Sequence, residues 1–297
     1  MLLNKRIPVS YIFNKIKFDL IYVSIIASIV LFITNKCLEN LPEMPLTIPT
    51  FIGTAISILL SFKLNQSYDR WWEARKIWGS IVNDSRSFVI QLQTLVKKGN
   101  DEMVKKIAYR QIAWCYCLGQ SLRNLNPIEN LEHFLSTPDI EEIKVHNNKP
   151  LAILQLNASC IKELQEQGQI ELFSQIQFDD TFLRLCESQG KAERIKNTIF
   201  PVTYRLFLHF IIYLFIVTLS ISLKDVSWYL ETPLLLLISM AFFLLEKSAT
   251  LMQDPFENKP TDTSMTSITR TIEINIKQLL KETNVPEPIK SDKFYIL

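Results

Sequence analysis

The sequence predicts an all-α membrane protein with four transmembrane helices and a helical cytoplasmic region. Four segments are apolar enough to cross a bilayer, which takes about 20 residues. The part between the second and third segments is charged and rich in helix-favouring residues, and no stretch alternates with period two for long enough to predict a sheet. The chain is 48% hydrophobic and 21% charged, with a mean hydropathy of +0.13, so the average combines two unlike parts.

The four candidate spans lie in two pairs, one near each end of the chain. They cover residues 20–33, which have ragged apolar flanks, then residues 46–62, 206–223 and 228–245. The first span starts late, follows an amphiphilic stretch and lacks an Ala-x-Ala exit. It is therefore predicted to remain as a span and not to be a cleavable signal peptide.

The charges beside the spans predict the orientation. Residues 1–19, 63–80 and 191–205 are each net positive, whereas the connectors 35–46 and 224–232 are each net negative. Loops with an excess of lysine and arginine stay on the cytoplasmic side of a membrane. Both termini and the long middle are therefore predicted to be cytoplasmic, with the two connectors outside.

The predicted organisation has four parts. Residues 1–80 form an N-terminal segment with the first two spans, and residues 81–200 form the helical cytoplasmic region. Residues 201–250 hold the last two spans, and residues 251–297 form a cytoplasmic C-terminal segment with a packing helix.

Periodic apolar residues predict the cytoplasmic helices. Helices are expected over residues 101–124, 150–173 and 178–196, with loops near 124–130 and 146–150. In the C-terminal segment, one helical face carries Ile268, Ile272, Ile276 and Leu280.

Sequence signatures of catalysis and cofactor binding are scarce. The chain has 6 glycines and no GxGxxG or GxxxxGK[ST] motif, so a phosphate-binding loop is not expected. The net charge of +2 gives no indication of a nucleic-acid partner. Cys115 and Cys117 could form half a metal site, but they have no nearby histidine and are predicted to be buried thiols. No enzyme activity, metal or cofactor is predicted.

His209 lies inside the third span. An ionisable group within a membrane is a functional hypothesis by default. A neutral histidine that is hydrogen-bonded to a neighbour is the preferred interpretation.

The second span carries an apolar stripe. Residues four apart stack along one face of a helix, which places Thr54, Ile58 and Phe62 together. Small residues on the other faces allow close helix packing: Gly53, Ala55, Ser57 and Ser61. In a ring of identical helices this stripe would form a hydrophobic constriction. Periodicity alone favours the alternative, in which the stripe packs inside a monomeric bundle.

Two longer motifs resemble one family. SFKLNQSYDRWWEARKIWG follows the second span, and DPFENKPTDTSMTSITRTIEINIKQLL follows the fourth. Together they resemble the bacterial branch of the bestrophin family. The motif residues are Arg70, Trp71, Trp72, Glu73 and Arg75, followed by Asp254, Pro255 and Phe256. The resemblance implies a homopentameric channel in the bacterial inner membrane. Its central pore would pass monovalent ions, either chloride or sodium and potassium, and would continue into a cytoplasmic vestibule.

The resemblance also implies which residues narrow the pore. The family's neck is lined by three residues of the second span, the last of them eight positions before the motif arginine. Counting back from Arg70 gives Phe62, Ile58 and Thr54, the same stripe that periodicity identifies. Threonine replaces the isoleucine that is common in the family, and its hydroxyl is expected to ease wetting of the neck. A second constriction is expected near Leu172, with Phe173 as the alternative.

The resemblance separates this chain from the animal members, which bind calcium through an acidic run after the Pro-Phe pair. Here residues 257–262 are interrupted by Lys259 and Pro260. Too few adjacent carboxylates remain for the six to eight oxygens that calcium prefers. Calcium activation through this segment is not expected.

The second span begins as an apolar helix and continues as a charged and aromatic one, which is expected of a helix that leaves the membrane for the cytoplasm. Trp71 and Trp72 suit the headgroup layer, and Arg70 and Arg75 suit the positive cytoplasmic side. Glu73 is expected to pair with neighbouring arginines. The alternative functions are a non-conducting membrane scaffold and, ranked last, a membrane-bound enzyme.

Overall fold

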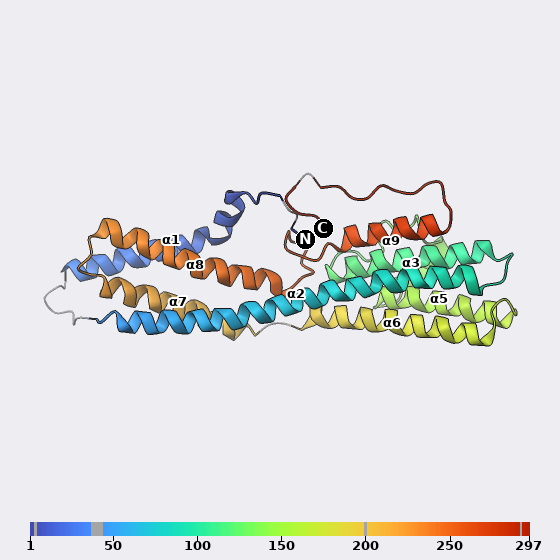
Figure 1. The fold of residues 1–297 in the computed structure, drawn as a ribbon, viewed down its shortest axis with the longest axis horizontal. Coiled ribbons are helices and arrows are strands. Elements are labelled where there is room, and N and C mark those ends of the chain that lie inside the picture. The colour runs from blue at the N-terminus through green and yellow to red at the C-terminus, as the bar shows by residue number, and fades with distance from the viewer. Residues whose placement is uncertain (3–4, 37–43, 199–200, 292) are drawn as a thin grey trace. The chain divides into compact units, whose positions relative to one another are not determined.

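A computed structural model describes residues 1–2, 5–36, 44–198, 201–291 and 293–297. These residues form α1 (Val9–Lys36), α2 (Thr47–Leu95), α3 (Asp101–Leu122), α4 (Thr137–Lys144), α5 (Lys149–Glu166), α6 (Leu172–Asn197), α7 (Val202–Ser222), α8 (Trp228–Gln253) and α9 (Met265–Leu279) (Figure 1). Over the described ranges there is no strand, apart from an isolated antiparallel bridge between Leu2 and Tyr295. The all-α prediction is confirmed.

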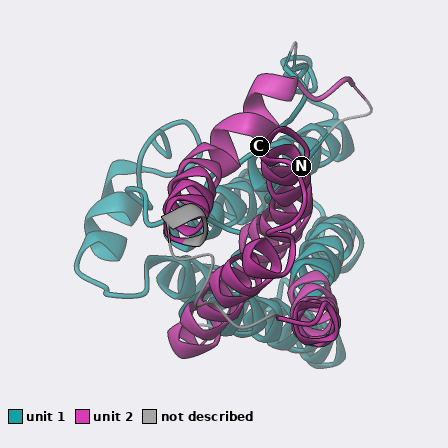
Figure 2. Ribbon diagram, turned by 90° about the vertical axis from the view of Figure 1, so that its left-hand side faces the viewer, with its two compact units in different colours: residues 1–4, 71–198, 254–297 teal, residues 5–70, 199–253 magenta. Residues whose placement is uncertain are grey.

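The chain divides into two compact units, shown in different colours in Figure 2. Unit 1 contains residues 1–4, 71–198 and 254–297, and unit 2 contains residues 5–70 and 199–253. Helix α2 contributes to both, because its residues up to Arg70 belong to unit 2 and those from Trp71 belong to unit 1. Each unit therefore joins segments that are far apart in the sequence.

Unit 2 contains the four candidate spans. Helix α1 packs against α7 and α8, which also pack against each other. The core of the unit is built from residues of all four helices, among them Val23, Ile56, Ile212 and Phe243. The four helices are long and apolar enough to cross a membrane, so the prediction of four spans is confirmed.

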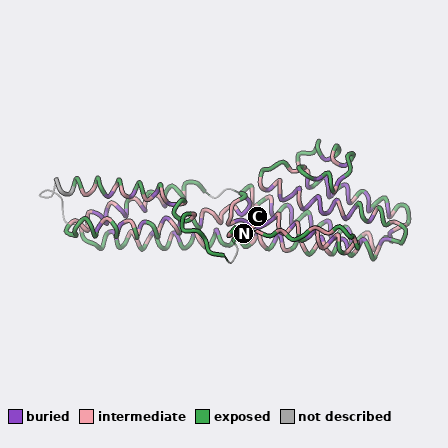
Figure 3. The backbone as a smooth tube through the Cα atoms, turned by 90° about the horizontal axis from the view of Figure 1, so that it is seen from above, coloured by how far each residue is buried: buried purple, intermediate pink, exposed green. Residues whose placement is uncertain are grey.

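The outer surface of unit 2 is unusually apolar. At most 39% of the residues in the apolar part of each span are buried, and exposed turns recur along these helices (Figure 3). Phe51 is 77% exposed, and Phe210 and Leu237 are each 64% exposed. Contiguous apolar surface on this scale marks contact with a bilayer or with other protein.

A small residue brings α2 close to α7. A Cβ atom placed on Gly53 would lie 3.1 Å from Cε2 of Phe215 on α7. This is tighter than ordinary van der Waals contact, so a side chain at position 53 would force the ring to move. The expectation that small residues allow close helix packing is met here.

Unit 1 is a helical bundle with its own core. Helix α3 packs against α5, α6 and α9, and α5 also packs against α4 and α6. The largest side chains in its core include Trp78, Trp114, Phe88 and Phe178. Hydrogen bonds attach α2 to its neighbours: Nε of Arg184 on α6 donates to Asp84 at 2.8 Å, and Nε of Arg86 donates to Asn275 on α9 at 2.8 Å.

Buried polar and thiol groups in this core are protected from water. Arg110 makes a two-pronged contact with Asp139, at 3.0 Å from Nε and 2.6 Å from a terminal nitrogen. Cys115 and Cys117 are fully buried, and burial raises the pKa of both thiols to about 12. Both are therefore protonated at neutral pH and are structural residues.

The structure corrects part of the predicted helix pattern. The helix expected over residues 150–173 ends at Glu166, because Gly168 adopts a positive φ of +69°. A new helix, α6, then begins at Leu172. Helix α4 was not predicted, although Ser136 caps it by accepting the backbone N–H of Asp139.

The helix expected near residues 101–124 is confirmed as α3, and the helix of the C-terminal segment is confirmed as α9. The expected connector 35–46 lies largely outside the described residues.

Candidate functional site

The predicted neck stripe lies on the exposed face of α2. Thr54 is exposed, and Ile58 and Phe62 are 54% and 61% exposed. On the opposite side of the helix, Ile56 and Leu60 are buried against unit 2. The monomeric-bundle alternative requires the stripe to pack inside the bundle. In unit 2 these three residues are exposed instead.

Lys63, the residue after Phe62, is buried in unit 2. Its ammonium group donates to Oε1 of Glu246 on α8 at 2.7 Å and to the hydroxyl of Thr250 at 3.0 Å. Thr250 in turn donates to the same carboxylate oxygen at 2.8 Å. The side chains of Lys63 and Glu246 are 0% and 1% exposed, so this is a fully desolvated ion pair.

A histidine completes this polar cluster. Nε2 of His209 on α7 lies 3.4 Å from the second carboxylate oxygen of Glu246, and its ring meets Phe243 edge-on. Helix α7 also holds α2 through the hydroxyl of Tyr204, which donates to the carbonyl of Leu59 at 2.9 Å. The preferred interpretation of His209 as a histidine hydrogen-bonded to a neighbour is met only in part. The carboxylate is close, but Nε2 makes no hydrogen bond within the described residues.

The ion pair fixes the rotation of α2. Successive residues of an α-helix point about 100° apart around its axis. Because Lys63 is held inward by Glu246, Phe62 lies about 100° around the helix from the buried side. It is 61% exposed there and lines a groove with Tyr204 and Phe207. A rotation that buried Phe62 would pull the lysine from its only compatible surroundings, since an unpaired buried charge is strongly unfavourable.

The Arg-Trp-Trp motif begins about two turns after Lys63. Nε of Arg70 donates to the carbonyl of Gln253 at 2.8 Å, within unit 2. In unit 1, the indole N–H of Trp71 donates to the carbonyl of Thr261 at 2.9 Å, and Trp72 is 47% exposed. The motif therefore acts through backbone carbonyls that follow the fourth span.

The following residues of the motif are more exposed. Glu73 pairs with Lys76 at 2.5 Å, with both side chains about half exposed. This corrects the expectation that it pairs with arginines: Lys76 stands one turn along the helix. Arg75 is partly exposed. Exposed pairs of this kind contribute at most about 1 kcal/mol.

The Asp-Pro-Phe motif starts a tightly bonded turn in unit 1. Asp254 pairs with Lys196 at 2.8 Å and accepts the backbone N–H of Phe256 at 3.0 Å. Pro255 and Phe256 are buried, so the motif anchors this turn in the core.

The same turn ends on a buried carboxyl. Asp262 is 0% exposed and accepts the backbone N–H of Lys259 at 3.0 Å. Burial, together with the nearby charge of Asp254, raises the pKa of Asp262 to about 6, although that hydrogen bond opposes the shift. Lys259 itself pairs with Glu257.

The residues predicted for the second constriction are exposed at the start of α6. Leu172 is 63% exposed and Phe173 is 80% exposed. They lie in unit 1 and the neck stripe lies in unit 2, so the structure does not bring the two predicted constrictions into one unit.

The sequence analysis did not identify the Lys63–Glu246 pair. A signal was available, because each charge stands at the end of an apolar span, directly after Phe62 in one case and Leu245 in the other. Opposite charges at matching ends of two spans indicate a buried pair. Which spans are neighbours is not visible in one sequence, so the pairing needed the fold.

The comparisons with known proteins agree on one family. The family model described as "Bacterial/Fungal Bestrophin protein" matches residues 5–278. The voltage-dependent anion channel-forming protein YneE of Escherichia coli O157:H7 is 31% identical over 248 residues, which is 84% of this chain and 81% of the relative. A voltage-dependent anion channel-forming protein of Ralstonia nicotianae is 26% identical over 258 residues, 86% of this chain and 83% of the relative.

A solved structure is similar over nearly the whole fold. The crystal structure of a bacterial bestrophin homolog from Klebsiella pneumoniae matches with a TM-score of 0.84 and 25% identity. The match covers 91% of this chain and 100% of the other.

Breaking one partner of the buried pair is expected to destabilise the protein strongly. Lys63→Met leaves the Glu246 carboxylate buried without its cation, a change that costs about 3–5 kcal/mol in comparable sites. Thermal unfolding of the purified protein in detergent should show a large drop in Tm. The double variant Lys63→Met/Glu246→Gln should regain most of it. Lys76→Met, at the exposed pair with Glu73, is the matched control and should change Tm little. An equal effect at both lysines would contradict the assignment.

Asp262 is expected to make stability depend on pH. Its pKa of about 6 lies above the ordinary value of 3.8, so the folded state binds more protons between these values. Stability should therefore fall as the pH rises from about 4 to about 6. Asp262→Asn should flatten this part of the Tm profile and raise Tm at neutral pH. The exposed Asp180→Asn should leave the profile as it is in the wild type; identical profiles for both variants would refute the prediction.

Proposed function

The chain belongs to the bacterial and fungal bestrophin family, and it is an ion channel of the membrane and not an enzyme. We propose that five copies of the chain surround one central pore that passes monovalent ions. The family match over residues 5–278 and the channel-forming relatives support this proposal. The pentamer is the assembly that the resemblance implies.

The observation that carries the proposal is the outward-facing stripe on α2. Thr54, Ile58 and Phe62 are the neck of the proposed pore. They are exposed in the single chain. The buried contact of Lys63 with Glu246 holds the helix in the rotation that leaves them exposed. Five such stripes around an axis would form a narrow apolar ring, which gates ions by the cost of dehydrating them.

Thr54 makes the outer level of this ring more polar. Its hydroxyl donates to the carbonyl of Thr50 at 2.9 Å, within the helix. The hydroxyl oxygen still has lone pairs that accept hydrogen bonds from water. Wetting is therefore easier at Thr54 than at Ile58 or Phe62, and the main barrier lies at the two inner levels.

Unit 1 is the proposed cytoplasmic part. We assign the vestibule to residues 81–200, with the C-terminal segment 251–297 packed against it and both termini in the cytoplasm. The positive charges flanking the spans support this orientation in a bacterial inner membrane. We assign the two pairs of spans to residues 1–80 and residues 201–250. The exposed Leu172 is the proposed second constriction.

The neck does not decide the sign of the permeant ion. It carries no charged side chain, so it excludes ions by size and dehydration. The relatives named as anion channel-forming proteins favour chloride. Sodium and potassium are the alternative that the bacterial branch of the family implies.

The neck proposal is tested by single-channel current in a planar bilayer under a tenfold KCl gradient. Ile58→Ala and Phe62→Ala remove the apolar barrier and should raise the current severalfold. Phe210→Ala and Leu237→Ala are matched controls, because these apolar residues of α7 and α8 are similarly exposed and should leave the current unchanged. Equal effects at all four positions would contradict the neck.

The same recordings give the sign of the ion. The reversal potential should approach the chloride equilibrium value, about 59 mV for a tenfold ratio of a monovalent ion. A value of that size with the opposite sign would identify a cation channel. No current from the wild type and none from the double variant Ile58→Ala/Phe62→Ala would favour a non-conducting scaffold.

Calcium is expected to leave the current unchanged. Two of the carboxylates after the fourth span already form ion pairs with lysines, because Asp254 pairs with Lys196 and Glu257 pairs with Lys259. Too few free carboxylate oxygens remain for a calcium site. A calcium titration of open probability checks this, and activation in the micromolar range would disprove it.

A further inference from the structure

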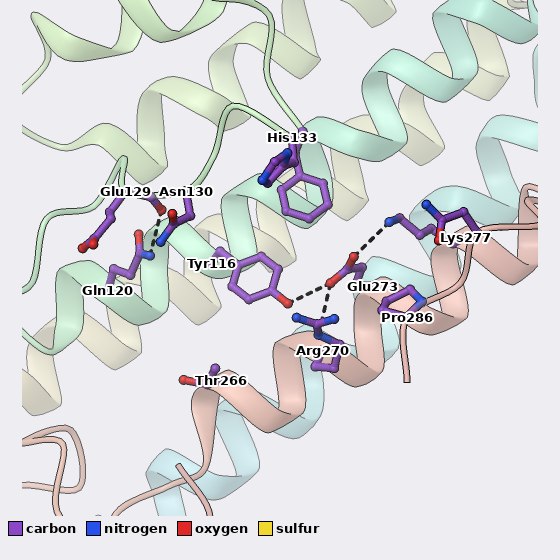
Figure 4. A pocket seen from close by; sticks show the side chains of 12 residues that line it. Tyr116, Gln120, Glu129, Asn130, His133, Thr266, Arg270, Glu273, Lys277 and Pro286 are labelled. Carbon is purple, nitrogen blue, oxygen red and sulfur yellow. Dashed lines mark hydrogen bonds and ion pairs between the residues drawn. The ribbon is translucent and has the colours of Figure 1, made fainter. Parts of the chain in front are cut away.

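Unit 1 contains a cavity that the proposed channel function does not use. Its volume is about 580 Å³, within the range of sites for small organic molecules. Helix α3 contributes Tyr116 and Gln120, helix α9 contributes Arg270, Glu273 and Lys277, and the segment before α4 contributes Phe134 (Figure 4). The C-terminal tail closes one side with Pro286.

The charged groups of this cavity are unevenly matched. Glu273 is 5% exposed and accepts the Tyr116 hydroxyl at 2.8 Å and the Lys277 ammonium at 3.0 Å. Nε of Arg270 is 3.4 Å from the same carboxylate. Arg270 and Lys277 therefore both pair with Glu273, and Lys277 also interacts with the charge of Glu282. Among the described lining residues, the other carboxylate is that of Glu129, which Figure 4 shows directed away from both cations.

Two buried polar atoms here lack hydrogen-bond partners among the described residues. One is Nε of Arg270, whose contact with Glu273 at 3.4 Å is too long for a hydrogen bond of good geometry. The other is Oε1 of Gln120, an acceptor that would need a donor from water or a ligand; its amide nitrogen donates to the carbonyl of Glu129. Buried polar atoms are nearly always hydrogen-bonded, so such atoms beside a cavity indicate a missing partner. The remaining guanidinium donors of Arg270 suit a carboxylate or a phosphate, which guanidinium binds through two hydrogen bonds.

Aromatic side chains also line the cavity. The rings of Tyr116 and Phe134 are stacked, with centroids 5.6 Å apart and planes 17° apart. Lys277 lies over the Phe134 ring at 5.6 Å, and His133 also lines the cavity (Figure 4). An apolar ring could therefore pack against these aromatic side chains while the charged end of the molecule reaches Arg270.

We propose that this cavity binds a small organic anion with a flat ring. The ring packs against Tyr116 and Phe134, and the carboxylate or phosphate of the ligand binds Arg270 and Lys277. The ligand would connect α3, α9, the segment before α4 and the C-terminal tail, and so would stabilise unit 1. This proposal is independent of ion conduction, because the cavity lies within unit 1 and the neck lies in unit 2.

The test uses the full-length protein purified in detergent at constant ionic strength. Phenylacetate and phenyl phosphate are the anionic probes, and phenylacetamide is a neutral probe of similar shape. Calorimetric titration should show saturable binding of at least one anion, about tenfold or more tighter than the amide, as expected for hydrogen bonds to a charged group. The tighter of the two anions identifies carboxylate or phosphate as the preferred group.

Variants locate the binding. Arg270→Gln should weaken anion binding about tenfold or more and leave amide binding nearly unchanged. Arg184→Gln removes another arginine of unit 1 that pairs with a carboxylate, Asp84, and is the matched control. If Arg270→Gln lowers Tm without ligand, Lys277→Gln provides the second test. Equal binding of all three probes, no saturable binding at millimolar concentration, or full affinity in both cavity variants would each overturn the proposal.

Discussion

The buried ion pair between Lys63 and Glu246 constrains the orientation of α2 and of its exposed stripe. Both charges lie in an apolar helix bundle where water does not compensate them, so each requires the other. Apolar packing tolerates a helix that rotates by some tens of degrees, because one aliphatic side chain replaces another. A charge pair at 2.7 Å with a threonine hydroxyl bridging it tolerates much less. The rotation of α2, and with it the direction of Phe62, therefore depends on one polar contact.

The two conspicuous motifs have different physical roles from that pair. Arg70 and Trp71 donate to backbone carbonyls that follow the fourth span, and Phe256 is buried in the core of unit 1. They hold together segments that are distant in the sequence. Motif residues that are so easily recognised thus serve mainly the architecture. The residues proposed to meet ions are ordinary apolar side chains that no motif marks.

Unit 1 combines a well-packed core with polar groups that are only partly satisfied. Arg110 and Asp139 match each other closely, whereas Arg270 and Lys277 both pair with Glu273, at 3.4 Å and 3.0 Å. Matched buried pairs stabilise one arrangement of a core. A less closely matched pair of cations beside a cavity instead leaves capacity for a further anion, which is why the cavity of α3 and α9 differs from the other polar contacts of the unit.

The sequence by itself determined the helical class, the four spans and the family, because apolar length and motif order are properties of local sequence. It also placed Thr54, Ile58 and Phe62 on one face of a helix, since helical periodicity is local. It misplaced the end of α5, where Gly168 takes a left-handed conformation, and it missed α4, a short helix whose start depends on the Ser136 cap. Only the tertiary structure decided that Lys63 faces Glu246 and that Arg270 and Lys277 converge on Glu273. These pairings join residues that are brought together by packing between helices, and one sequence contains no record of which helices are neighbours.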